Sequence, residues 1–343
     1  MKQYLIPNEG NFYKANMHTH STFSDGCNSV EKIKEMYKAH GYSVVAFTDH
    51  NVMVDHSDLN DEEFLAITSY EIDTNTPPRA DNPDIKTYHI NFYAKDPHTT
   101  TYPCANPKYA WGRAGEYVQD YYKGDYERRY SVEGQNEMIA EANAKGFLVC
   151  YNHPAWSLQS HEDFAGLEGL CALECYNTGC EREGFVLDMT EYVYHDMLCR
   201  GKRIYPMAAD DSHGDGDCFG GWVRFKAPAL EYGAIINAYE KGDFYASWGP
   251  DFESLYLEDG ILKMDFTPSA KVYLTTERRF AIRIVMTDEP LTHAEFDIRS
   301  YLERSRGYDL SKLFFRVTIV DEKGDKALSR GYFLDELDPS YFA

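Results

Sequence analysis

Residues 16–26 read NMHTHSTFSDG, and the architecture of the chain can be worked out from this segment. His18 and His20 stand two positions apart at the end of an apolar run, followed by Asp25 in a loop. Side chains two apart on an extended strand leave the same face, so two imidazoles there can share one metal ion. The segment therefore predicts a strand that ends in a metal-binding loop.

Similar apolar runs, each stopping abruptly at a polar residue, recur over the next 190 or so positions. The runs span residues 12–20, 44–50, 64–71, 89–94, 147–153, 170–177 and 204–213. Helical spacing, with plausible caps, occurs over 30–41, 138–146 and 235–242. Continuous apolar runs are typical of strands buried on both faces, and their alternation with helices predicts an α/β fold with a parallel barrel.

The pattern changes at about residue 251, where alternating apolar residues replace continuous runs. A two-residue Asp259-Gly260 turn precedes Leu262, Met264 and Phe266, which alternate as in a half-buried antiparallel strand. We expect residues 1–250 to form the metal-binding barrel and residues 251–343 a small β-sandwich. Nothing in the sandwich sequence indicates its role.

A Tyr-rich connection over about residues 96–130 is longer than loops usually are without a function or structure of their own. It is either a lid over a site or a surface segment that packs on its own aromatic residues.

Histidines and carboxylates gather at the ends of the apolar runs. Because the carboxyl ends of parallel strands open onto one rim, residues dispersed over 200 positions are expected to converge there. The candidate metal ligands are His18, His20, Asp25, His50, Glu71, His89, His153, Asp211 and His213. Any one of these histidines could be a satisfied structural group, and Asp25 before Gly26 could be an ordinary turn residue. The repeated placement favours a polynuclear site.

Nine nitrogen and oxygen ligands exceed the needs of one ion, so two or three divalent metals are implied. The set is rich in histidine and contains no sulfur, which suits Zn, Mn or Fe better than Ca or Mg. Cys27 and Cys218 lie in loops near the polar clusters, but most of the eight cysteines stand in apolar runs and are expected to be buried thiols.

Charge and hydrophobicity indicate which kinds of partner and which cellular compartment to expect. The 343 residues contain 34 Lys plus Arg against 56 Asp plus Glu, a net charge of −22, which disfavours long nucleic acids. No apolar run approaches the roughly 20 residues of a membrane span. The first residues, MKQYLIPNEGNFYK, lack the apolar core of a secretory signal, which favours the cytoplasm. The oligomeric state is not indicated.

The motifs resemble those of the polymerase and histidinol phosphatase (PHP) family over roughly residues 14–250. They are His18-x-His20 with Ser-Asp-Gly, Thr48-Asp49-His50, Glu71, His89, Asn152-His153-Pro154 and Asp211-x-His213. The resemblance implies a distorted (β/α)7 barrel with metals at its C-terminal rim.

The resemblance also implies a distribution of ligands. One metal would be held by His18, His20, Glu71 and Asp211, and a second by Asp25, His50, Glu71 and His213, with Glu71 bridging. His89 and His153 would carry a third. Many trinuclear members have histidine where Asp25 stands, whereas others carry aspartate, so the metal identity stays open.

The chemistry expected of such a site is hydrolysis of a phosphoester of a small molecule, such as a nucleotide or sugar phosphate, by metal-activated water. Candidate catalytic residues are Arg182, as a phosphate clamp, and Asp49, as a general acid. Arg182 could instead be a surface cation paired with Glu181 or Glu183, and Asp49 could orient a ligand histidine. The alternatives are an exonuclease or phosphodiesterase acting on short oligonucleotides, and a non-catalytic metal-binding module.

Overall fold

The computed structural model describes residues 2–77, 85–118, 122–185 and 188–342. Seven strands match the seven apolar runs, and their existence is confirmed. They are β2 (Asn11–Asn16), β3 (Val44–Phe47), β4 (Leu65–Asn75), β5 (Thr87–Ala94), β6 (Phe147–Tyr151), β7 (Ala172–Asn177) and β8 (Tyr205–Ala209). Two further strands, β9 (Trp222–Ala227) and β10 (Phe244–Ser247), complete this half of the molecule.

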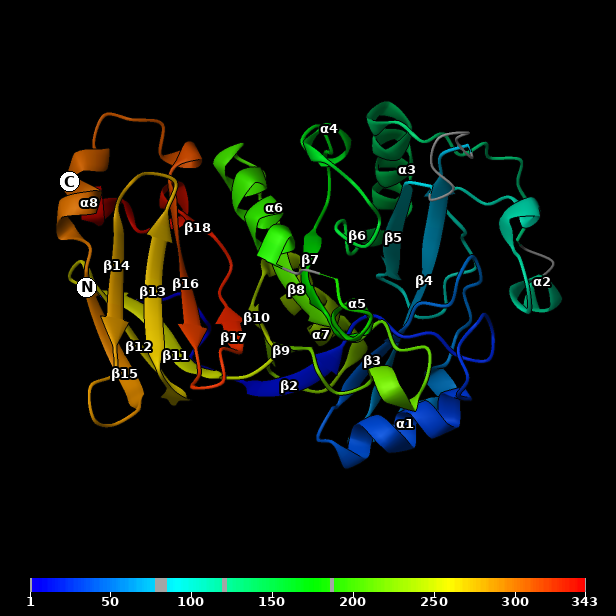
Figure 1. The fold of residues 1–343 in the computed structure, drawn as a ribbon, viewed down its shortest axis with the longest axis horizontal. Coiled ribbons are helices and arrows are strands. Elements are labelled where there is room, and N and C mark those ends of the chain that lie inside the picture. Colours follow the sequence, from blue (N-terminus) through cyan, green and yellow to red (C-terminus); the bar gives the residue numbers. More distant parts are fainter. Residues whose placement is uncertain (1, 78–84, 119–121, 186–187, 343) are drawn as a thin grey trace.

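The helices of this half follow or separate the strands (Figure 1). They are α1 (Val30–Ala39), α2 (Ala114–Tyr117), α3 (Val132–Ala144), α4 (His161–Phe164), α5 (Thr178–Arg182), α6 (Asp188–Cys199) and α7 (Tyr232–Lys241). The three predicted helices are confirmed as α1, α3 and α7. The side chain of Ser29 accepts a hydrogen bond from the amide of Lys32 at the start of α1, and Gly242 ends α7 with φ 69°.

The strands form one long hydrogen-bonded path in the order β14-β13-β16-β17-β10-β9-β2-β3-β4-β5-β6-β7-β8. The ladders β2-β3-β4 and β6-β7-β8 are parallel, as expected. The prediction of an entirely parallel sheet is wrong at β5, which pairs antiparallel to both β4 and β6. In the described residues the path is open, so the closed (β/α)7 barrel stays a prediction.

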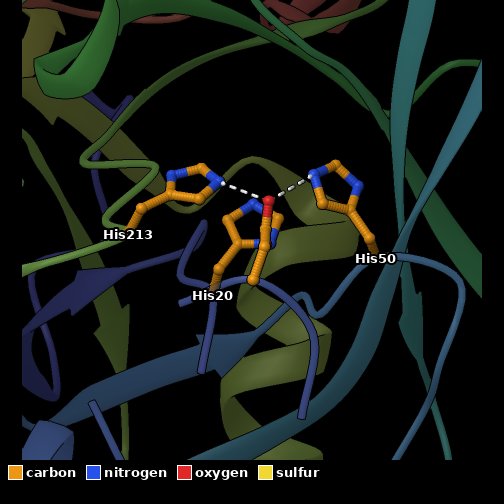
Figure 2. Close-up of side chains that lie close together, drawn as sticks. His20, His50 and His213 are labelled. Atoms are coloured by element: carbon orange, nitrogen blue, oxygen red, sulfur yellow. Dashed lines mark ion pairs between the residues drawn. The ribbon is translucent and has the colours of Figure 1, made fainter. Parts of the chain in front are cut away.

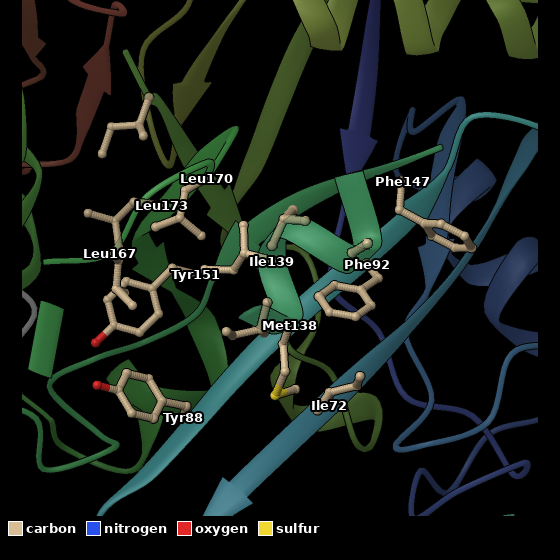
Figure 3. Packing of buried hydrophobic residues seen from close by; sticks show 14 of the residues in the cluster. Ile72, Tyr88, Phe92, Met138, Ile139, Phe147, Tyr151, Leu167, Leu170 and Leu173 are labelled. Atoms are coloured by element: carbon tan, nitrogen blue, oxygen red, sulfur yellow. The ribbon is translucent and has the colours of Figure 1, made fainter. Parts of the chain in front are cut away.

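Helix α3 covers β5 and β6 with an apolar face (Figure 3). Met138 and Ile139 are fully buried, and they belong to the same core cluster as Phe92, Phe147 and Tyr151. Removing this much apolar surface from water is the main stabilising contribution to this half. The packing holds β5 and β6 in place beneath the loops that carry the site.

The second half is built from β11 (Phe252–Glu258) onward and has two packed sheets. Its other elements are β12 (Ile261–Ser269), β13 (Lys271–Thr276), β14 (Ala281–Val285), β15 (Leu291–Asp297), α8 (Arg299–Ser305), β16 (Phe314–Val320), β17 (Lys326–Leu328) and β18 (Tyr332–Phe333). The first sheet has the order β1-β11-β12-β15, where β1 is Lys2–Tyr4, and its buried residues share a core with those of β13 and β16. The Asp259-Gly260 turn is confirmed, with φ of 50° and 78°.

The two halves share secondary structure across residue 250. Strand β17 pairs with β16 on one side and with β10 on the other, so the large sheet passes from one half into the other. The N-terminal strand β1 pairs with β11. The division at residue 250 stays a prediction. No helix in the described part of the chain is long and apolar enough to cross a membrane.

Candidate metal centre

All nine predicted ligands come together in one cluster. Seven of them line a cavity of about 430 Å³, and His18 and His20 lie buried next to them. The lining residues are Asp25, His50, Glu71, Asp73, Asn75, His89, Trp111, His153, Trp156, Gly179, Cys180, Glu183, Asp211, His213 and Asp217. The expected convergence of residues from distant runs is therefore observed.

Backbone hydrogen bonds and an isolated bridge set the positions of five of these residues. His18 and His20 face the Asp211–His213 segment: the amide of Asp211 donates to the carbonyl of His18 at 2.9 Å, and that of His20 to the carbonyl of Ser212 at 2.9 Å. His50 and Glu71 form an isolated parallel bridge. Asp211 adopts φ 52°, a left-handed conformation that is costly for a residue with a side chain and is often found at functional sites.

His89 reaches the same rim because β5 runs in the opposite direction. Its partner in the β4–β5 ladder is Asp73, two residues beyond Glu71. In an antiparallel strand the first residues, not the last, lie at the rim where the neighbouring parallel strands end. His89 thus joins the cluster as predicted, but from the beginning of an antiparallel strand and not from the end of a parallel one.

Glu71 is the centre of the cluster. One oxygen, Oε1, lies 3.3 Å from Nε2 of His18, 3.2 Å from Nδ1 of His89 and 3.6 Å from Nε2 of His153. The other, Oε2, lies 3.5 Å from Nε2 of His20 and 3.2 Å from Nδ1 of His50. The carboxylate thus has a different group of imidazoles at each oxygen, as a carboxylate that bridges two ions would.

Asp211 and Asp25 supply carboxylates at two other points. Oδ1 of Asp211 lies 3.1 Å from Nε2 of His18 and 3.0 Å from Nε2 of His20. Asp25 lies between two histidines, with Oδ2 3.8 Å from Nε2 of His50 and 3.4 Å from Nε2 of His213 (Figure 2). Asp25 is therefore placed as a ligand would be, and its role as a ligand stays a prediction.

The cluster's charges are strongly coupled. Burial disfavours the ionised form of Glu71, but the surrounding His89, His18 and His50 hold its pKa well below the usual range. Burial, together with His20, lowers the pKa of His50 to about 4. His213 is the opposite case: burial opposes its charge, yet a hydrogen bond to Asp25 and the charge of Asp211 raise its pKa to about 10.

The side chains present fit a group of divalent cations. Several buried donor or acceptor atoms lie near charged neighbours but make no hydrogen bond of acceptable geometry with any described residue: Nδ1 of His20, Nδ1 of His50, Oε2 of Glu71, Nε2 of His153 and Oδ1 of Asp211. In addition, Nε2 of His18 and Nε2 of His20 face each other at 3.2 Å. Unpartnered buried polar atoms are costly, and bound cations would satisfy them.

Three supporting residues were not among the predicted site residues. Oε1 of Glu174 accepts a hydrogen bond from Nδ1 of His18 at 2.6 Å, and its Oε2 accepts from Nδ2 of Asn177 at 3.0 Å. Nδ2 of Asn152 donates to Oε1 of Glu71 at 2.7 Å. Such contacts fix the orientation of ligand side chains. A carboxylate inside the apolar run 170–177 was the available signal for Glu174.

Asp49 and Arg182 do not line the cavity. Both oxygens of Asp49 accept hydrogen bonds from the loop after His20: from the amide and hydroxyl of Ser21 and from the hydroxyl of Ser24. The guanidinium of Arg182 contacts the carbonyl of Cys218 at 3.3 Å. Asp49 therefore shapes the ligand loop, and the geometry gives no support to a direct catalytic role for either residue.

The connection over residues 96–130, of which 119–121 lie outside the described residues, contributes to the cavity. The Trp111 ring lies 5.2 Å from that of His50, centroid to centroid. Arg113 links the connection to the ligand loop, because Nε donates to the carbonyl of Ser24 at 2.8 Å and Nη2 to that of Gly26 at 2.5 Å. Of the two interpretations of this segment, its placement favours a lid over the site.

The cysteines contribute little to the candidate metal centre. All eight are free thiols, and Cys27 and Cys199 are exposed. Cys180 lines the cavity, where burial and the nearby carboxylates of Asp211 and Glu174 raise the pKa of its thiol. Burial also raises the pKa of Cys218. These two thiols are poor candidates for metal ligands, since thiolate is the ligating form.

Residues 16–150 match the model of the PHP domain, so the resemblance to that family is confirmed over this part of the chain. The six candidate ligands from His18 to His89 fall inside the match, whereas His153, Asp211 and His213 follow it. No curated protein matches the chain.

Among solved structures, the chain is similar to a two-domain protein from Bacteroides vulgatus ATCC 8482 that contains a predicted PHP-like metal-dependent phosphoesterase. The identity is 14%, with 85% of this chain and 88% of that chain covered and a TM-score of 0.45. A candidate metal-dependent phosphoesterase from Bifidobacterium adolescentis ATCC 15703 is 16% identical, covering 61% and 90%, with a TM-score of 0.37. An amidohydrolase from Chromobacterium violaceum, with bound sulfate and no metal, is 14% identical, covering 67% and 96%, with a TM-score of 0.41.

Proposed function

We propose that this protein is a metal-dependent hydrolase that cleaves a phosphoester of a small molecule. The observation that carries the proposal is the position of Glu71, whose two oxygens face five imidazoles within 3.6 Å while Asp25 and Asp211 complete the cluster. The PHP domain match supports the same conclusion.

The distribution of ligands that we propose is the one implied by the resemblance to the PHP family, and all nine side chains lie close enough together to serve in it. His18, His20, Glu71 and Asp211 would hold one divalent ion, and Asp25, His50, Glu71 and His213 a second. His89 and His153 would hold a third. When bound, such ions lower the pKa of a coordinated water and neutralise the charge that develops on a phosphoryl group. Zn, Mn and Fe suit these donors.

The protein's own side chains prepare the site for these ions. Glu174 holds His18 so that Nε2 faces Glu71 and Asp211. Asn177 donates to both Glu174 and Asp211, which couples the two carboxylates. The described residues that line the cavity include no Lys or Arg, so attraction of an anionic phosphoryl group would depend on the metals.

A phosphoester panel tests the proposal. The protein is loaded with Mn, Zn or Fe and assayed for phosphate release from monoesters, including p-nitrophenyl phosphate, and for cleavage of a dinucleotide. Wild type should release phosphate, and His50→Ala should lower kcat at least about a hundredfold, because a ligand is lost. The matched control is His293→Ala, an exposed histidine in the second half.

The panel separates the candidate functions. Cleavage of the dinucleotide without release of phosphate from monoesters would favour a phosphodiesterase. The absence of turnover with every ester and every metal, at full metal occupancy, would overturn the hydrolase proposal and favour a binding module.

A further inference from the structure

The outer part of the cavity has an unusual composition for a site that handles phosphate. Beyond the nine ligands, the charged residues in the described part of its lining are acidic: Asp73, Glu183 and Asp217. Two tryptophans, Trp111 and Trp156, provide the apolar surface. This part of the cavity would face whatever group carries the phosphate.

The tryptophans stand over different members of the histidine cluster. The Trp111 ring lies 5.2 Å from that of His50, and the Trp156 ring lies 5.5 Å from that of His89 and 5.1 Å from that of His153. Trp111 is 46% exposed, which is high for so large an apolar side chain. Flat apolar surfaces beside a catalytic cluster suit a ring that stacks on them.

The hydrogen-bonding groups of this lining are mostly acceptors, because several of its donors are already used. The indole N–H of Trp156 donates to Oε2 of Glu183 at 2.8 Å, and Nδ2 of Asn75 donates to Oδ2 of Asp73 at 2.9 Å. The amides of Gly179 and Cys180 donate to Asp210 and Asn177. A ligand group here must therefore supply donors of its own.

The lining also repels negative charge. A second phosphate bound near Glu183 or Asp217 would find no lysine or arginine among the described lining residues to neutralise it, whereas Asp73 is partly compensated by Arg128, whose Nη1 lies 3.6 Å from Oδ1 of Asp73. Hydroxyl groups, in contrast, donate readily to carboxylates and carry no charge. A nucleobase would stack as well, but besides its N–H donors it carries ring-nitrogen or carbonyl acceptors, which would face acceptors of the lining.

We propose that the cavity selects monophosphate esters of neutral, hydroxyl-rich rings, such as sugars or cyclic polyols, and rejects esters with a second phosphate. The ring stacks on Trp111 or Trp156 and donates its hydroxyls to Glu183, Asp217 and Asn75. This inference rests on the phosphoester hydrolysis proposed above, and it names the substrate class of that site.

Matched substrates test the inference on the metal-loaded protein. Glucose 6-phosphate and glucose 1,6-bisphosphate differ by one phosphate, adenosine monophosphate offers a base, and p-nitrophenyl phosphate offers only a plain ring. We expect kcat/KM for glucose 6-phosphate to exceed that for the bisphosphate and for adenosine monophosphate at least about tenfold. An equal or higher value for either would overturn the inference.

Variants of the lining identify the cause. Asp217→Asn should raise kcat/KM for the bisphosphate about threefold or more, because one repelling charge is removed. Asp215→Asn, in the same short helical turn but paired with Lys32 outside the cavity, is the matched control. Trp111→Ala should lower kcat/KM for glucose 6-phosphate about tenfold, whereas the exposed Tyr192→Ala should not. An equal rise of kcat/KM for the bisphosphate in Asp217→Asn and Asp215→Asn would count against repulsion by Asp217 as the cause.

Failure of this inference is distinguishable from failure of the proposed function. If p-nitrophenyl phosphate is hydrolysed but glucose 6-phosphate is not preferred, only the inferred substrate class is wrong, and the proposed phosphoesterase function stands. If no ester is turned over, the binding of glucose 6-phosphate can still be measured by quenching of tryptophan fluorescence. Quenching that is smaller in Trp111→Ala would support the inferred selectivity of the cavity. The lack of quenching in wild type would overturn it.

Discussion

Nδ1 of His18 lies 2.6 Å from Oε1 of Glu174, and both side chains are buried. A carboxylate can only accept here, so Nδ1 carries the proton and Nε2 is left free to bind a cation beside Glu71 and Asp211. The tautomer of a candidate ligand is thus set by a strand, β7, that contributes no ligand of its own.

Replacement of Glu174 by glutamine tests this relationship. Glu174→Gln keeps the size and one acceptor oxygen but removes the charge, so we expect affinity for Mn²⁺ to fall about tenfold with the fold retained. Titration of Mn²⁺ into metal-free protein measures the change. Glu181→Gln, whose carboxylate contacts the hydroxyl of Tyr176 instead, is the control. Equal affinities in Glu174→Gln and wild type would show that the contact is not needed.

Metal removal should lower thermal stability. Ions that bind only the folded chain stabilise it, by about 2.7 kcal/mol when their free concentration is a hundred times Kd. For a chain of this size, chelation is expected to lower the melting temperature by about 5 °C. Calorimetry with and without chelator measures the shift, and metal analysis confirms the loss. An unchanged melting curve after complete removal would contradict a shared multinuclear site.

The metal-free protein should lose stability as the pH rises, because of His213. The folded pKa of His213, about 10, lies above its ordinary value of 6.5 through the contacts with Asp25 and Asp211. A raised histidine pKa gives stability that is fully present below pH 6.5 and is lost as the pH approaches 10. Urea unfolding at pH 6.5 and 9.5 should show a larger decrease for wild type than for His213→Gln.

The comparison with His213→Gln removes the contribution of lysine and tyrosine residues that titrate in the same range. Parallel pH dependence of the two proteins would refute the assignment. Metal binding must also expel the proton from His213, so Mn²⁺ affinity of wild type should increase between these two pH values.

Arg113 should control substrate affinity through the 96–130 connection. Its guanidinium joins the Trp111 segment to the carbonyls of Ser24 and Gly26, which flank Asp25. Arg113→Gln should raise KM for the best ester of the panel about fivefold and change kcat less, since it acts mainly on binding. Arg129→Gln, which loses only an exposed ion pair with Glu137, should leave both constants unchanged. A drop in kcat with constant KM would instead place Arg113 with the metal cluster.

The ligand cluster was predictable because its residues, apart from Asp25 in a loop, stand within or at one end of an apolar run, where a polar group costs free energy unless it has a use. The direction of β5 was not predicted, because an apolar run looks the same in either direction. Its one directional signal is that His89 begins its run, whereas His50 and His153 end theirs.

Other features depend on tertiary contacts that leave no local pattern. The turn of α5 puts Glu183, not Arg182, at the cavity, whereas the sequence favoured Arg182 and suggested Glu183 only as a possible ion-pair partner for it. Trp111 reaches His50 only because Arg113 joins its segment to a loop some 90 positions away. Rules for residue spacing apply within one helix or strand, so they do not predict contacts between distant segments.

The pairing of β17 with both β16 and β10 bears on how the protein can be dissected. Cutting the chain after residue 250 to express the half with the metal cluster would strip β10 of one of its two neighbours, β17, and leave β1 without β11. Bare strand edges recruit other chains, so such a fragment should precipitate or form oligomers. Crystallographers and enzymologists are better served by the intact polypeptide, with point substitutions in place of truncations.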